Sequence, residues 1–283
     1  MKKPVDIDYL INEVITLPSL PSTVSRISDL LNDPTAPLSD VGKIIATDPA
    51  IALKTLRLVN SAYYGLATKV TSVEHAVVLL GVKVIKNLVF TATVFDTFKS
   101  GADVLLKHSV ATGMAMQAMV ESCGSRSDVD REGAFVFGLL HDIGKIILEE
   151  FLPEEFEQAR GLAKRRAVPV YQVEREIIGV DHAEVGGRLA ENWKLPPELI
   201  NAISGHHDLS QCRSNAMRPL AAMLSVADYI CVASGIPAET GAVCIVSDDI
   251  WRASGVTSRQ VPAILGKFFA AVPGIDEICQ VAA

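Results

Sequence analysis

Histidine and aspartate residues that could bind metal recur in the second half of the chain. The strongest signal is the adjacent pair His141-Asp142, which stands at the end of an apolar run and just before Gly144 and Lys145. Imidazole supplies nitrogen ligands, and a carboxylate supplies oxygen and can bridge two ions. The glycine would relieve crowding beside such ligands. A His-Asp pair by itself is a weak signal, because it occurs by chance in many proteins.

Further candidate ligands strengthen that signal because they follow one another in a definite order. Five of the six histidines belong to this series, and His75 is the one outside it. The candidate ligands are His108, His141, Asp142, His182, His206, His207 and Asp228. Asp228 lies in an apolar helical pattern, where a buried carboxylate needs a partner, and a cation is the simplest one.

Hydrophobic residues at helical spacing predict an all-α fold that would position these ligands. The composition, 49% hydrophobic but only 6% aromatic, suits close packing of helices. Helices are predicted upstream after Ser39, at Asp48-Pro49, after a Thr71-x-x-Glu74 capping box and over Val82–Phe98. Further helices are predicted over residues 103–122, 132–141, 146–151, 154–166, 170–178, 181–193, 197–206, 217–233 and 258–271.

The chain is expected to form two helical lobes and a C-terminal extension. Ser100-Gly101 is the best candidate boundary between the lobes. The predicted organisation is an N-terminal lobe at residues 1–100, a metal-binding core at 101–240 and a helical extension at 241–283. Residues 239–255 give the weakest pattern in the sequence.

Charge and cysteine content limit the classes of partner and compartment. The formal charge of −7 and the pI near 5.4 argue against general attraction to nucleic acid. Five cysteines without a CxxC spacing indicate reduced thiols. Acidic residues interrupt the start of the chain where a signal peptide would be apolar, and charged residues interrupt the apolar stretches. A cytoplasmic protein without a membrane span is expected.

The order of the candidate ligands resembles that of HD-domain phosphohydrolases, particularly the HD-GYP cyclic-dinucleotide phosphodiesterases. Upstream segments resemble the hallmarks of the HDOD family, and the resemblance covers roughly residues 10 to 235. These segments are Leu17–Pro21, Asp48–Ala50, Leu56–Gly65 and Val70–Gly81. The resemblance implies a bacterial signal-transduction protein in which an N-terminal helical lobe packs on an HD-like helical core.

The resemblance also implies a metal content. HDOD proteins are generally regarded as relatives of HD enzymes that have lost part of the catalytic set, but this chain keeps the full His/Asp list. One ion would be held by His108, His141 and Asp228, and the other by His182, His206 and His207, with Asp142 bridging them. Iron, manganese, zinc and nickel all suit such ligands.

Two departures from the phosphodiesterase pattern narrow the expectation. No Gly-Tyr-Pro follows His207, which argues against specificity for cyclic dinucleotides. Val104 stands one helical turn before His108, where enzymes with an additional metal can offer a carboxylate, so two ions are expected rather than three.

Three functions remain open at the level of sequence. The first is a regulatory or ligand-sensing module, whose partner would be a signalling protein or a small phosphorylated ligand. The second is a metal-dependent phosphohydrolase or phosphodiesterase in which Asp142 and Lys145 are catalytic, with Lys145 neutralising phosphate charge. The third is a metal-free scaffold for protein interactions. The sequence does not determine the oligomeric state.

Overall fold

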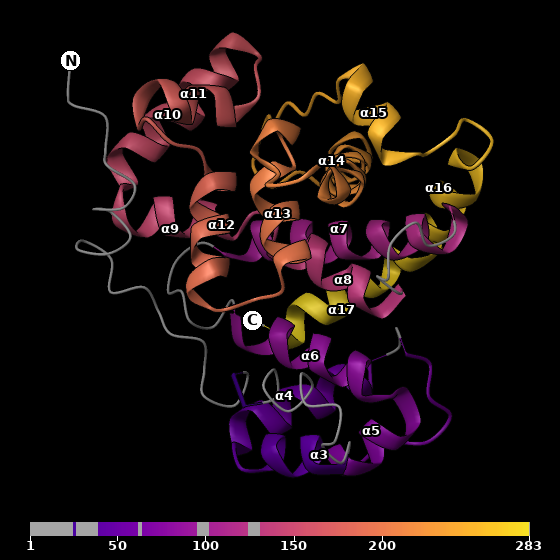
Figure 1. Cartoon of the computed structure of the whole chain (residues 1–283). Coiled ribbons are helices and arrows are strands. Elements are labelled where there is room, and N and C mark those ends of the chain that lie inside the picture. The colour runs from indigo at the N-terminus through magenta and orange to yellow at the C-terminus, as the bar shows by residue number, and fades with distance from the viewer. Residues whose placement is uncertain (1–24, 27–38, 62–63, 95–101, 124–130, 283) are drawn as a thin grey trace. The chain divides into compact units, whose positions relative to one another are not determined.

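The computed structural model describes residues 25–26, 39–61, 64–94, 102–123 and 131–282, and every regular element among them is a helix (Figure 1). The prediction of an all-α fold is therefore confirmed. The described residues fall into two compact units: those between residues 25 and 94 together with 269–282, and those between residues 102 and 268. The predicted extension at 241–283 is thus divided between the two units. The Leu17–Pro21 segment and the Ser100-Gly101 boundary lie outside the described residues.

Among the described residues, the smaller unit contains four full helices from the first part of the chain and the last helix. These are α3 (Ser39–Ala46), α4 (Pro49–Val59), α5 (Val73–Leu80), α6 (Val82–Val94) and α17 (Pro273–Ala282). The sequence did not predict α17. It packs against α4 and α6 because its apolar face, which includes Ile275 and Ile278, is buried there.

Polar side chains set the ends of the helices in this unit. The Asp48 carboxylate accepts hydrogen bonds from the backbone N–H groups of Ala50 and Ile51, which confirms the predicted start of α4. The predicted capping box is wrong by one residue, since the Ser72 hydroxyl rather than that of Thr71 accepts from the His75 N–H. Ser72 has the extended backbone that a capping residue requires.

The larger unit contains the remaining helices. They are α7 (Ala102–Cys123), α8 (Arg131–Leu140), α9 (Ile143–Phe151), α10 (Pro153–Arg166), α11 (Val170–Ile177), α12 (His182–Asn192), α13 (Pro197–Gly205), α14 (Arg218–Ala233), α15 (Asp248–Ser254), most of α16 (Val261–Ala271), and two short 3-10 turns, Leu209–Gln211 and Asn215–Met217. Most lie within three residues of their predicted bounds. Helix α15 was missed because it is short and stands in the segment with the weakest pattern; the Ser247 hydroxyl caps it.

Glycines allow the helices that carry candidate ligands to approach one another closely. A Cβ atom added to Gly138 of α8 would lie 2.2 Å from the backbone nitrogen of Gly113 in α7. A Cβ atom added to Gly144 of α9 would lie 2.0 Å from the carbonyl oxygen of His182, at the start of α12. Side chains at these two positions would force the backbones apart, so both glycines determine where the candidate ligands lie.

One stretch of the described chain, Asn215–Ala233, is long and apolar enough to cross a membrane by length and composition alone. In the fold, 61% of that stretch is buried inside the protein, as in the core helix of a globular domain. It contains α14 and the buried Asp228.

We predict that Gly144→Ala lowers the free energy of unfolding by about 2 kcal/mol or more, because the new methyl group collides with the backbone of α12. Gly266→Ala is the matched control: its Cβ would meet no atom within 4 Å, and replacing a helical glycine by alanine stabilises by roughly 0.5–1 kcal/mol. Urea unfolding followed by circular dichroism measures both. Equal stability of the two variants would contradict the close approach of α9 and α12.

Candidate metal centre

The seven candidate ligands come from five separate parts of the larger unit and converge on one point. His108 lies in the middle of α7, His141 and Asp142 in the turn between α8 and α9, and His182 at the start of α12. His206 and His207 directly follow α13, and Asp228 lies within α14. Six of the seven are buried, and His207 is partly buried. The structure thus brings together all the residues that the sequence selected as ligands.

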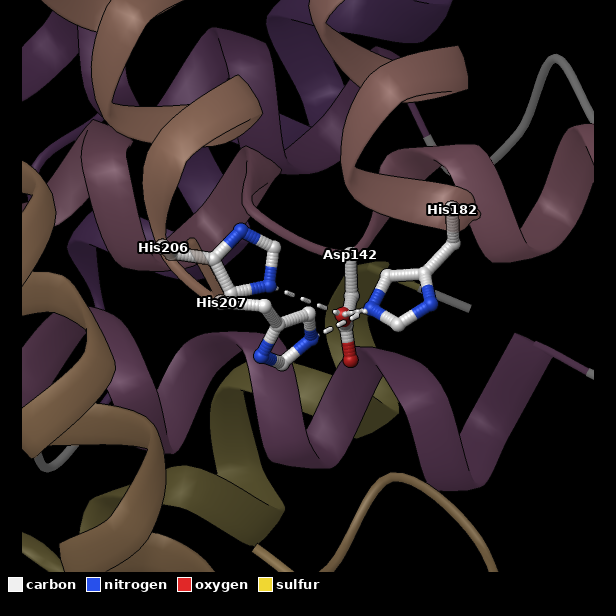
Figure 2. Close-up of side chains that lie close together, drawn as sticks. All are labelled: Asp142, His182, His206 and His207. Atoms are coloured by element: carbon white, nitrogen blue, oxygen red, sulfur yellow. Dashed lines mark hydrogen bonds and ion pairs between the residues drawn. The ribbon is translucent and has the colours of Figure 1, made fainter. Parts of the chain in front are cut away.

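Asp142 lies at the centre of this group, and its two oxygens face different histidines. Figure 2 shows the carboxylate with His182, His206 and His207. Oδ1 is 3.1 Å from His182 Nε2 and 3.9 Å from His206 Nε2. Oδ2 is 3.4 Å from His141 Nε2 and 3.8 Å from His108 Nε2. The carboxylate stands at the N-cap position of α9 but caps no backbone N–H group. It is therefore available to be shared between two sites.

The ligand atoms form two groups that have Asp142 in common. His182, His206 and His207 make one group with Asp142, and His108 and His141 make the other; within each group the candidate ligand atoms lie within 4.8 Å of one another. Asp228 adjoins the second group, since its Oδ1 is 3.1 Å from His108 Nε2. This partition matches the one that the family resemblance implies.

Hydrogen bonds on the outer side of the rings orient their inner nitrogens. The Nδ1 atoms of His108, His141 and His206 lie 2.8, 2.8 and 2.6 Å from the carbonyl oxygens of Ile236, Gly138 and Ile203. His182 Nδ1 lies 2.6 Å from the Glu174 carboxylate. Because these acceptors have no proton to give, each Nδ1 donates, and the Nε2 of each neutral ring has a free lone pair.

The Nε2 atoms meet in the centre of the cluster, where those of the neutral rings suit a cation. His108 and His141 bring their Nε2 atoms within 3.3 Å of each other, and His182 and His207 bring theirs within 2.9 Å. The Nε2 of His206 is buried and has no hydrogen-bond partner. Buried polar atoms are otherwise paired. A set of inward-facing imidazole nitrogens around two carboxylates has the chemistry of a transition-metal site.

The charge of the cluster favours the same interpretation. Burial and the neighbouring histidines lower the pKa of His206 to about 3, and they hold the pKa of His207 well below its usual value. Burial also lowers the pKa of His141. For His182, burial acts to lower the pKa, but the Glu174 and Asp142 carboxylates outweigh it and raise the pKa to about 10. The cluster thus attracts positive charge while keeping three of its rings in the neutral form that binds metal.

Lys145 lies at the edge of the cluster. Its Nζ is 2.8 Å from Asp142 Oδ2, and its side chain is 12% exposed. Although burial alone would lower the pKa of Lys145, the Asp142 and Glu239 carboxylates raise it. Lys145 is thus a cation held beside the shared carboxylate.

The sequence pattern did not identify several residues that surround the candidate ligands. Glu174, fully buried on α11, accepts from both Nδ1 and the backbone N–H of His182. The Tyr171 ring stacks on His207 with 4.3 Å between ring centroids. The available signal for Glu174 was its position four residues after Val170 on the apolar face of a short helix, where a carboxylate is out of place.

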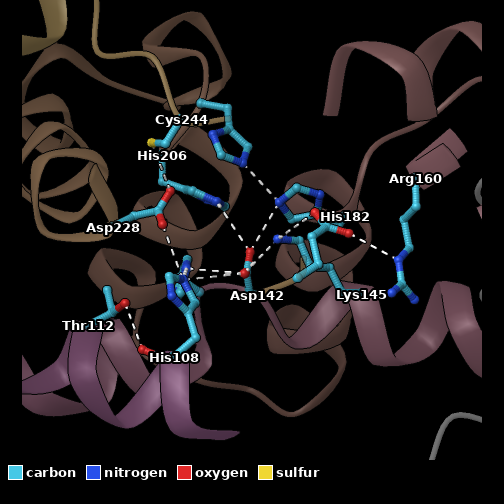
Figure 3. A network of polar contacts seen from close by, with 12 residues as sticks. His108, Thr112, Asp142, Lys145, Arg160, His182, His206, Asp228 and Cys244 are labelled. Atoms are coloured by element: carbon cyan, nitrogen blue, oxygen red, sulfur yellow. Dashed lines mark hydrogen bonds and ion pairs between the residues drawn. The ribbon is translucent and has the colours of Figure 1, made fainter. Parts of the chain in front are cut away.

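A segment without regular structure, residues 236–245 (the covering segment), lies against one side of the cluster. The carbonyl of Ile236 accepts from His108, and the Cys244 thiol donates to Asp228 Oδ2 at 3.3 Å (Figure 3). Glu239 Oε1 is 3.9 Å from Lys145 Nζ. The cavity between this segment and the cluster, lined by His207 and Asp228 among others, has a volume of about 30 Å³. It has room for water molecules but not for a nucleotide.

We predict that Glu174→Gln weakens metal binding about 10- to 100-fold, because the residue that orients a ligating histidine loses its charge. Glu176→Gln, two residues along the same helix, is the control, since Glu176 is exposed and pairs with Arg166. Equilibrium dialysis against zinc measures both variants. Unchanged zinc affinity in Glu174→Gln would contradict the contribution of the Glu174 charge to metal binding by His182.

Comparison with known proteins places the chain in a family. The HDOD domain model matches residues 17–209. An uncharacterized protein of Treponema pallidum is 28% identical over 196 residues, which are 68% of this chain and 38% of that protein. Ribonuclease Y of Mycoplasmoides gallisepticum is 26% identical over 134 residues, which are 47% of this chain and 20% of that enzyme. The chain therefore spans well under half the length of these curated relatives.

Solved structures share the fold over nearly the whole chain. An HDOD domain protein of unknown function from Geobacter sulfurreducens has a TM-score of 0.81 and 25% identity, with 96% of each chain covered. A candidate phosphohydrolase from Shewanella amazonensis has a TM-score of 0.76 and 22% identity, with 97% and 98% covered. Since the family model spans well over half of the sequence and an HDOD protein has the same fold from end to end, this chain belongs to the HDOD family.

Proposed function

We propose that this chain is a cytoplasmic bacterial signal-transduction module whose His/Asp cluster binds two divalent transition-metal ions and responds to a ligand or a partner protein. The observation that carries the proposal is the position of Asp142, whose two oxygens face two separate groups of imidazoles. A metal-free scaffold would have no need of inward-facing lone pairs or of a buried His206 nitrogen without a partner.

Two sets of residues would hold the ions. His108, His141 and Asp228 would form one set. His182, His206 and His207 would form the second, and Asp142 would be shared between the two sets. When bound, such ions supply Lewis acidity and folding free energy. The mixture of imidazole and carboxylate suits iron, manganese, zinc and nickel.

The covering segment favours sensing over turnover. It closes the cluster down to a cavity of about 30 Å³, and enzymes that act on nucleotides need pockets about ten times larger. A centre that is closed at rest and tied to a segment of irregular structure is suited to report ligand binding as a change in that segment. The natural partners are a small phosphorylated ligand or a signalling protein.

We expect about two equivalents of transition metal per chain in protein purified without an affinity metal, and less than about one in Asp142→Asn, because both sites lose their shared ligand. Asp249→Asn, on the exposed surface of α15, is the control and should retain the wild-type content. Elemental analysis after aerobic and anaerobic purification measures all three. A wild-type protein that stays metal-free after reconstitution under both conditions would refute the dinuclear centre.

Metal-dependent phosphohydrolysis is the second candidate function, and the position of Lys145 favours it. Its ammonium group lies beside the shared carboxylate and borders the small cavity. There it could neutralise the charge of a phosphate ester. Asp142 would then serve as the shared ligand of a catalytic centre.

Turnover separates the two functions. For a sensor we expect metal-loaded wild-type protein to hydrolyse a panel of phosphomonoesters, phosphodiesters and cyclic nucleotides no faster than its Asp142→Asn variant. Release of inorganic phosphate, or of nitrophenol from synthetic esters, measures the rate. Hydrolysis that is lost in both Asp142→Asn and Lys145→Gln but retained in Asp249→Asn would instead establish the enzyme.

A further inference from the structure

Two cations of the larger unit enclose one carboxylate of the covering segment. Glu239 Oε1 lies 3.9 Å from Lys145 Nζ, and Glu239 Oε2 lies 3.2 Å from Arg160 Nε. Figure 3 labels the two cations, Lys145 and Arg160. The Glu239 side chain is 11% exposed and that of Lys145 is 12% exposed. Lys145 comes from α9 and Arg160 from α10, so the carboxylate is held between two helices that precede it by many residues.

The fit of Glu239 between these cations is incomplete. Its Oε2 is buried, and the contact with Arg160 lacks the geometry of a hydrogen bond, so this oxygen has no hydrogen-bond partner. The distance from Glu239 Oε1 to Lys145 Nζ is close to the upper limit for an ion pair. A buried acceptor without a donor is unfavourable. The two cations therefore form an anion site that this carboxylate only partly satisfies.

The surroundings of Glu239 leave room for a larger anion. A cavity of about 140 Å³ lies between the covering segment and α10 and is lined by Arg160, Lys164, Glu239 and Gly241, among others. The smaller cavity beside Lys145 lies against the same segment, and Glu239 borders both. Residues around Glu239 are thus loosely packed on both sides, in contrast to the dense core of the unit.

One glycine directly before the covering segment and one within it allow the backbone to change direction. Gly235 and Gly241 have φ angles of +80° and +81°, which glycine adopts without strain. Besides the ion pairs of Glu239, the segment contacts the cluster through two hydrogen bonds, one to the carbonyl of Ile236 and one from the thiol of Cys244. Displacing Glu239 would therefore break few contacts.

We propose that Lys145 and Arg160 form the binding subsite for a phosphate group of the ligand, and that Glu239 occupies this subsite until phosphate displaces it. The inference rests on the proposed function and specifies its ligand class. The planar guanidinium of Arg160 offers paired donors that match phosphate oxygens, and Lys145 offers a point charge. Phosphate has more charge and more acceptor oxygens than a carboxylate, so it fills the subsite better than Glu239 does.

Neighbouring carboxylates compete weakly for the same cation. Glu149 Oε1 and Glu157 Oε2 each lie 3.6 Å from Arg160 Nη1, but their side chains are 39% and 73% exposed. Solvent screens exposed pairs of this kind. Glu149 therefore offers a matched control, since it contacts the same guanidinium and does not line the cavity beside Glu239.

Binding of inorganic phosphate to the full chain tests the inference by isothermal titration calorimetry. We expect Glu239→Gln to bind phosphate at least about tenfold more tightly than wild type, because the competing charge is gone. Glu149→Gln should change the affinity less than about twofold, and the double variant Glu239→Gln, Arg160→Gln should lose the gain. Equal or weaker binding in Glu239→Gln, or no phosphate binding by either protein, would overturn the subsite.

A second measurement on the wild-type protein needs no variant. Saturating phosphate should increase hydrogen exchange at the amides of residues 238–245 while leaving α12 and α13 unchanged, because the segment is released when Glu239 is displaced. Unchanged or slower exchange in the segment would contradict displacement.

Metal content, measured on the same samples, separates this inference from the proposed metal function. A metal-loaded protein without the Glu239→Gln effect refutes the subsite alone. A metal-free protein that shows the effect refutes the metal centre alone, because Lys145 and Arg160 remain in place.

Discussion

The burial of the Asp142 carboxylate is the constraint on which the larger unit depends. The side chain is 2% exposed and lies among four histidine nitrogens and one lysine ammonium. Removing such a charge from water is costly unless it is surrounded by positive charge. Burial opposes ionisation, but His141, Lys145 and His182 hold the pKa of Asp142 well below its usual range. The helices are arranged so that one lysine ammonium group and four imidazole rings reach one carboxylate.

Orientation of the ligands comes from groups outside the cluster. Backbone carbonyls hold three of the rings. The carbonyls of Gly138 and Ile203 lie near the ends of the helices that precede the ligands. Carbonyls at helix ends have no partner within the helix, so they are free to accept from a ring three residues later. The fourth ring depends on Glu174, which lies eight residues before His182 on the preceding helix, α11. Local sequence therefore orients some ligands, and tertiary packing orients the others.

The covering segment connects the two proposals for this protein. A closed cluster explains how an HDOD protein could retain a complete ligand set without being an efficient hydrolase, because a substrate would have to displace Glu239 first. The same arrangement lets a phosphate-bearing ligand act on the segment through the two cations that Glu239 now contacts. Sensing and slow hydrolysis would then share a ligand class, and they would differ in whether the displaced segment signals to a partner or admits the ester to the metal ions.

Sequence alone determined much of this protein. Helical periodicity indicated the all-α fold, and Asp48 and Asp181 marked helix starts correctly, since capping depends on residues that are neighbours in the chain. The order of histidines and aspartates also selected the residues that converge. Their roles as ligands remain predictions.

The tertiary structure decided what depends on distant segments. It placed α17 with α4 and α6 in the smaller unit. It brought the backbone of His182 so close to Gly144 that a side chain there would collide with it, and it brought Glu174 to the same histidine. It also brought Glu239 between Lys145 and Arg160, although residues 239–255 gave the weakest pattern in the sequence. Periodicity reports only which face of an element is buried, whereas the partner of a buried charge is set by the packing of elements far apart in the chain.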